Sequence, residues 1–115
     1  MNKRKGLALI CFVSGILLTP IALILAFFSA GAGHGDYALT RLLFPYSMLL
    51  TLTAGDQITN PLIVIGLIQF PIYGVLSAVG ALRSKRVLIS VLIAIGVVHL
   101  IAAITCFSGI LPNFS

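Results

Sequence analysis

Few side chains in this sequence are equipped for chemistry, and His99 is the most informative of them. It stands at the centre of the apolar run 87–111. A histidine in the middle of a membrane span is costly, and by default it faces a helix-bundle interior or a wet cavity, as in a proton relay or a ligand site. The alternative is a neutral imidazole that donates a hydrogen bond to a backbone carbonyl or to Gln69. Relay chains commonly use carboxylates, and neither Asp36 nor Asp56, the two acidic residues, lies inside the three strongest apolar runs. This favours the structural role.

Two further polar side chains lie within apolar runs. Gln69 stands two residues before Pro71, so it is placed either to contact His99 or to serve carbonyls that the proline kink frees. Both roles stay open. Thr19 precedes Pro20, and its hydroxyl can return a hydrogen bond to a backbone carbonyl beside that kink. His99, Gln69 and Thr19 are therefore the intramembrane polar candidates.

A third group of polar residues gathers in the segment AGAGHGDYALTR, residues 30–41. His34 and Asp36 alone do not fill a metal site, so no metal is predicted. Asp36 is expected to cap a helix that starts at Tyr37, where its charge favours the amino terminus. His34 is then solvated at the membrane surface, and Arg41 extends from the start of that helix to the lipid headgroups.

Neither a catalytic group nor a cofactor site is recognisable. The sequence has no glutamate and no tryptophan, and no phosphate-binding loop or nucleophile paired with a base. Cys11 and Cys106 lie inside apolar runs, where a thiol behaves as a small hydrophobic side chain. We therefore expect a protein that is not an enzyme and needs no cofactor. An enzyme at the outer face that uses His34 and Asp36 is the weakest hypothesis.

The composition indicates an integral membrane protein. Of 115 residues, 60% are hydrophobic and only 8% are charged, whereas a soluble domain carries about a quarter charged residues. The net charge of +5 does not indicate nucleic-acid binding, because six of the seven basic residues form two short clusters beside apolar runs, at 3–5 and 83–86. Such clusters orient spans and meet anionic lipid headgroups. The expected surroundings are a lipid bilayer, with no nucleic-acid partner.

The elements that must position these residues are hydrophobic helices in a single transmembrane domain, residues 1–115. The expected fold is an all-α integral membrane protein, a compact bundle of four hydrophobic helices at about 6–30, 37–54, 61–82 and 87–111. The second helix is the weakest, because its uncharged core, 42–54, is shorter than the roughly 20 residues of a span. Pro45 also interrupts it early.

The two basic clusters set the topology question. The positive-inside rule places both of them in the cytoplasm, so an even number of crossings must separate them. Helix 37–54 is then interfacial or re-entrant, three helices span, and the amino terminus is cytoplasmic. The rival is a plain four-span bundle with the clusters on opposite sides. Both topologies stay open. In either case we expect a multi-pass protein of a cell membrane, the bacterial inner membrane.

Small residues recur at four-residue spacing on three of the expected helices. Such faces let helices approach closely, and packing within the chain is favoured over packing on a partner helix. The residues concerned are Ala22 and Ala26, Gly74 and Ala78, and Ser90 and Ala94.

The expected function is helix–helix interaction, as an accessory subunit, regulator or immunity-type protein of a membrane partner. The partner is another membrane protein or a second copy of the chain. The alternative is a small oligomeric transporter or channel subunit that uses His99 and Gln69 within the bilayer.

Overall fold

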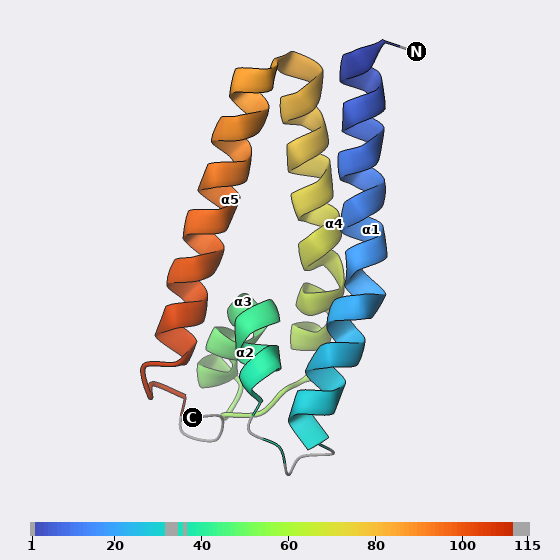
Figure 1. The fold of residues 1–115 in the computed structure, drawn as a ribbon. Helices are drawn as coiled ribbons and strands as arrows, with labels where there is room; N and C mark the ends of the chain where they lie inside the picture. Colours follow the sequence, from blue (N-terminus) through green and yellow to red (C-terminus); the bar gives the residue numbers. More distant parts are fainter. Residues whose placement is uncertain (1, 32–34, 36, 112–115) are drawn as a thin grey trace.

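The computed structural model describes residues 2–31, 35 and 37–111, and helices dominate them (Figure 1). Over these residues, three α-helices are long and two are short. No strand occurs among the described residues. The elements in chain order are α1 (Lys3–Ala30), α2 (Ala38–Leu43), α3 (Pro45–Leu50), a 3-10 turn η2 (Thr51–Thr53), α4 (Asn60–Arg83) and α5 (Lys85–Cys106).

The long helices α1, α4 and α5 are each long and apolar enough to cross a membrane. This confirms the all-helical class and the three strong apolar runs. The expected single helix over 37–54 is wrong, because the segment is split into α2, α3 and η2. Pro45 explains the break: it has no N–H to continue the ladder of α2, and it starts a new helix at its first turn instead.

Capping explains where the long helices begin. The Asn2 side chain accepts a hydrogen bond from the Lys5 N–H at 2.8 Å, so α1 starts three residues before the expected Gly6. At α4, Thr59 takes the cap position and Pro61 lies in the first turn. The helix therefore starts at Asn60, one residue before the expected start at residue 61.

A single residue joins α4 to α5. Ser84 is extended (φ −169°, ψ 163°), and its hydroxyl accepts from the Val87 N–H at 3.1 Å. The helix α5 ends at Cys106 rather than at residue 111. The following turn includes Gly109 at φ 88°, a left-handed conformation that glycine adopts without steric cost.

The helices α1 and α4 pack backbone against backbone. A Cβ built on Gly15 would lie 2.5 Å from the carbonyl oxygen of Phe70, and one on Gly74 would lie 3.0 Å from the carbonyl oxygen of Cys11. Neither position tolerates a side chain without a shift of backbone. The packing expected of Gly74 is thus within the chain.

The other small residues divide into two groups. Ala22 and Ala26 are buried in a cluster with Phe44, and Ala78 packs beside a second buried cluster, so these three also serve the chain's own packing. Ser90 and Ala94, in contrast, are exposed on α5. Packing within the chain accounts for the first group alone.

Between α1 and α4 the chain folds back on itself. In Figure 1, α2 rises from the end of the molecule where α1 finishes, and η2 returns the chain to that same end before α4 begins. The helix α2 contacts α1 and α5, and α3 contacts α4 and α5. We call residues 38–53 the hairpin. It fills the space between the three long helices in one half of the molecule.

Candidate functional site

The site lies at the tip of the hairpin, residues 42–45, where α2 stops and α3 starts. Phe44 has φ −127° and ψ 55°, outside the helical region, and Pro45 follows it. The last carbonyls of a helix have no partner within it, and a proline beyond removes a further donor. Buried carbonyls here need hydrogen bonds from elsewhere in the molecule.

Two of the predicted polar candidates supply these hydrogen bonds. The His99 Nε2, from α5, lies 2.7 Å from the Leu42 carbonyl oxygen. The Gln69 Nε2, from α4, donates to the Leu43 carbonyl oxygen at 2.8 Å. The two side chains are brought to adjacent residues of one tip. The backbone-carbonyl role considered for His99 is the one that the structure has, while Gln69 serves the hairpin rather than the Pro71 kink.

A pair of tyrosines extends the site. The Tyr73 Oη, from α4, lies 2.7 Å from the His99 Nδ1 and 2.9 Å from the Tyr46 Oη. Both tyrosine rings meet the imidazole in edge-on geometry, with centroids 5.8 and 5.9 Å from it. Because Tyr46 belongs to α3, the chain of hydrogen bonds starts and ends on the hairpin, with α5 and α4 in between.

This chain of hydrogen bonds accommodates two states of the imidazole. Because Nε2 faces a carbonyl oxygen, it carries a hydrogen in both states. In the neutral state, Nδ1 accepts the Tyr73 hydrogen, and Tyr46 donates to the Tyr73 oxygen, the reverse of the direction in the structure, where Tyr73 donates to Tyr46. In the protonated state, Nδ1 donates to the Tyr73 oxygen, and the Tyr73 hydroxyl donates to Tyr46. Every hydrogen bond survives the change, so a proton can be held at Nδ1 without loss of a contact.

The base of the hairpin is held by hydroxyl groups. The Thr40 Oγ1 donates to the Ala26 carbonyl at 3.0 Å, and the Thr40 N–H donates to the Ser29 Oγ at 3.2 Å. On α3, the Ser47 Oγ donates to the Leu62 carbonyl at 2.9 Å. The hairpin is thus tied to α1 and α4 near its base, and to α4 and α5 at its tip.

The small polar side chains of the hairpin form a stripe that faces the interior of the protein. Thr40, Ser47 and Thr51 are all buried, whereas Leu42 and Leu50 are 45% and 39% exposed. In water this arrangement would be inverted, but it is the order expected where the surroundings are apolar and every polar group must be satisfied inside. Ser47 and Thr51 are four residues apart, the spacing of neighbours on one helical face. Tyr46 and Tyr73 had no such signal.

Of the outer-loop candidates, Arg41 differs from expectation. Arg41 is buried, with 8% of its surface exposed, and its guanidinium carbon lies 4.2 Å from the centroid of the Phe107 ring. It does not reach outward, because an aromatic face beyond the end of α5 receives it. The helix α2 starts at Ala38, one residue later than predicted, with Tyr37 in the cap position. His34 and Asp36 lie outside the described residues.

Thr19 and the two cysteines have structural roles. The Thr19 Oγ1 donates to the Gly15 carbonyl at 3.1 Å, the backbone bond predicted for it beside Pro20. Cys106 is fully buried, and its Sγ donates to the Pro45 carbonyl at 3.4 Å. Cys11 is half-buried and, like Cys106, free. Among the described residues, no group of three histidine, cysteine or acidic side chains could hold a metal ion.

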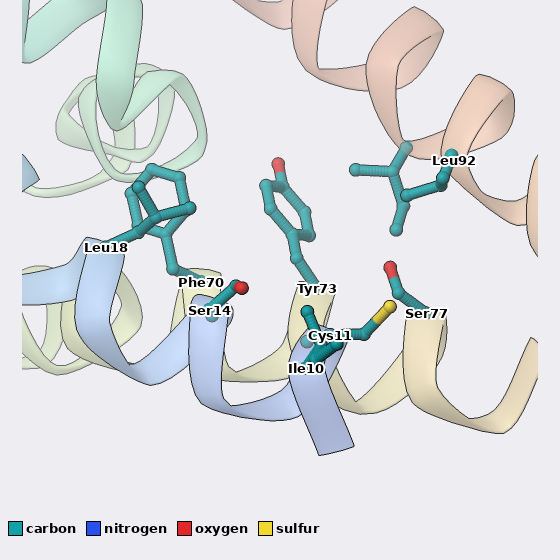
Figure 2. Close-up of a pocket in the computed structure, with 11 residues that line it drawn as sticks. Ile10, Cys11, Ser14, Leu18, Phe70, Tyr73, Ser77 and Leu92 are labelled. Carbon is teal, nitrogen blue, oxygen red and sulfur yellow. The ribbon is translucent and has the colours of Figure 1, made fainter. Parts of the chain in front are cut away.

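Beyond the hairpin tip lies a cavity of about 310 Å³ bounded by α1, α4 and α5 (Figure 2). Figure 2 shows the Tyr73 ring standing between Phe70 and Leu92, so this tyrosine belongs both to the cavity wall and to the hydrogen-bonded tip. No charged side chain lines the cavity. Its lining consists of Ile10, Cys11, Ser14, Gly15, Leu18, Phe70, Tyr73, Gly74, Ser77, Leu92 and Ile95.

No protein-family model matches the sequence, and no curated protein or solved structure is significantly similar to it.

Proposed function

We propose that the chain is a multi-pass membrane protein in which α1, α4 and α5 cross the bilayer. Each is apolar over at least the length of a span. The amino terminus and the α4–α5 turn lie at the same end of the molecule (Figure 1), so the basic clusters at 3–5 and 83–86 meet one membrane face. By the positive-inside rule that face is cytoplasmic, in a bacterial inner membrane.

In this placement the hairpin is re-entrant. It enters from the outer face, turns at the tip and returns, so it never crosses. Irregular backbone is tolerated at membrane depth only where protein or water satisfies it. The bonds from His99 and Gln69 to the tip carbonyls, and the buried polar stripe, fit that requirement. The three-crossing arrangement also removes the charge conflict of a four-span bundle.

The proposed activity is helix–helix interaction, as an accessory subunit, regulator or immunity-type protein of a membrane partner. The observation that carries it is the exposed face of α5, opposite its buried face. Ser90 and Ala94 lie there one turn apart, with Val97 and Ile101 on the same stripe. Small and β-branched side chains let another helix approach closely. The chain's own packing leaves this stripe uncovered, while its intramembrane imidazole and amide are engaged by the hairpin.

Site-specific photo-cross-linking in intact cells tests the proposal. A photoreactive residue at Ala94 should give one adduct of defined mass. The same residue at Leu76 on α4, which is also exposed, should give none. An adduct of twice the chain mass identifies a second copy as the partner, and another mass identifies a different protein. No adduct from Ala94, or equal adducts from both positions, would count against the proposal.

A second candidate is a proton-coupled transporter or channel subunit. It is favoured by one observation, the continuous hydrogen-bonded chain Tyr46–Tyr73–His99 at the edge of the cavity. Proteoliposomes with an internal pH dye would measure it: proton flux that disappears in His99→Leu supports transport. Flux at the level of protein-free liposomes, in both the parent and the variant, rules it out.

A further inference from the structure

We propose that the cavity between α1, α4 and α5 binds one acyl chain of an anionic phospholipid, with the headgroup held by the basic residues at the cytoplasmic end of the same helices. The proposal rests on the membrane placement above, and it does not depend on a protein partner for α5.

The chemistry of the cavity suits a hydrocarbon chain. Its wall is aliphatic and aromatic, apart from the thiol of Cys11 and the hydroxyls of Ser14, Ser77 and Tyr73. Gly15 forms part of the same wall. With no charged group to pair and few donors to satisfy, a polar ligand would lose its hydration without compensation. An apolar occupant meets no such cost.

The size of the cavity selects a narrow occupant. Along α1 the lining runs from Ile10 to Leu18, which is about 12 Å at 1.5 Å per residue. A partner helix is about 10 Å across, much wider than a single extended chain of methylene groups, and the cavity holds about 310 Å³. The cavity therefore suits a single extended chain of methylene groups.

The depth of the cavity matches one leaflet. Its α1 wall, 10–18, lies about 8 to 20 Å from Lys5 along the helix axis, and its α4 wall, 70–77, lies about 9 to 20 Å from Arg83. Half of a hydrocarbon core is about 15 Å thick. A lipid acyl chain whose headgroup lies at the basic end would therefore run beside the cavity wall over most of one leaflet. It would finish near Tyr73, where the hairpin closes the space.

Charge at the mouth of the cavity selects the headgroup. Six cationic side chains lie at the end where α1 starts and α4 turns into α5 (Figure 1). All of them are exposed. Basic residues at this level attract anionic lipids. The six are Lys3, Arg4, Lys5, Arg83, Lys85 and Arg86.

Native mass spectrometry of the purified full chain, titrated with phosphatidylglycerol or phosphatidylcholine, tests the proposal. One phosphatidylglycerol should bind in preference to phosphatidylcholine. Ser14→Trp places a large side chain on the exposed edge of the cavity and should abolish that first binding step. Its matched control, Val13→Trp, alters an exposed neighbour that does not line the cavity, and should bind like the parent. Circular dichroism checks that both variants are folded.

The headgroup assignment has its own test. Lys85→Gln with Arg86→Gln should weaken phosphatidylglycerol binding about fivefold for each cation that contacts the headgroup, and should leave phosphatidylcholine binding unchanged. Equal affinity for the two lipids would overturn the anionic headgroup. Unchanged lipid binding in Ser14→Trp would overturn the acyl-chain site.

Discussion

Replacing Gln69 by leucine removes one of the side-chain donors to the carbonyls of the hairpin tip. Gln69 is 5% exposed, and its Nε2 lies 2.8 Å from the Leu43 carbonyl. Leaving such a carbonyl without a donor costs about 1 to 3 kcal/mol, while measured interhelical bonds in membrane proteins average about 0.6 kcal/mol. The Gln69 Oε1 is buried and accepts no hydrogen bond from the described residues, so its removal offsets part of the loss. We expect a net destabilisation of about 1 kcal/mol.

The assay is unfolding of the purified chain in mixed micelles, followed by helicity, with Ile68→Leu as the control. Ile68 is the preceding residue of α4 and is 46% exposed, so its substitution should change the free energy of unfolding by less than about 0.5 kcal/mol. Labelling of a cysteine introduced at Leu43 should rise about fivefold in the Gln69→Leu background, the factor that 1 kcal/mol represents. Stability equal to or above the parent, with unchanged labelling, would refute the role of Gln69 as a support for the tip.

Three further substitutions probe the packing and the site. Gly15→Ala should lower the free energy of unfolding by about 1 to 3 kcal/mol, because its Cβ would meet the Phe70 carbonyl at 2.5 Å. In the control, Gly6→Ala, the new Cβ meets nothing within 4 Å, so denaturation should show unchanged or higher stability. Equal effects of the two substitutions would contradict the close α1–α4 contact. Thr40→Val should cost about 1 kcal/mol by the same assay, and no loss would contradict the bond to α1. Tyr73→Phe and His99→Leu should couple by more than about 0.5 kcal/mol in a double-mutant cycle, and strict additivity would show that their hydrogen bond is absent.

The long helices were predictable because their signal is local. Each comes from an uninterrupted apolar run, and short-range capping accounts for the shifts at their ends, as at Asn2 and Ser84. The break at Pro45 was also visible, because a proline in a short apolar run removes a backbone donor wherever the run lies. Its consequence, two short helices rather than one, depended on contacts that a local pattern does not contain.

The site was predictable by residue type and not by geometry. His99 and Gln69 stood out because polar groups in apolar runs need partners. Their partners lie far along the chain: Leu42 is 57 residues from His99, and Leu43 is 26 from Gln69. No periodicity indicates which carbonyl a break will free or which helix will face it. Tyr73 was overlooked because a tyrosine in an apolar run is an ordinary packing residue until its hydroxyl meets an imidazole.

The central claim is that the hairpin enters and leaves by one face, so that three helices cross the membrane. Its most direct measurement is the side of the membrane on which a cysteine in a tag fused after Ser115 can be labelled, in a variant with Cys11 and Cys106 replaced by alanine. A tag at the amino terminus serves as the reference. We predict labelling by an impermeant maleimide at the carboxyl-terminal tag from outside the cell, with the amino-terminal tag protected. Protection of both tags would contradict the three-crossing account and require a fourth span.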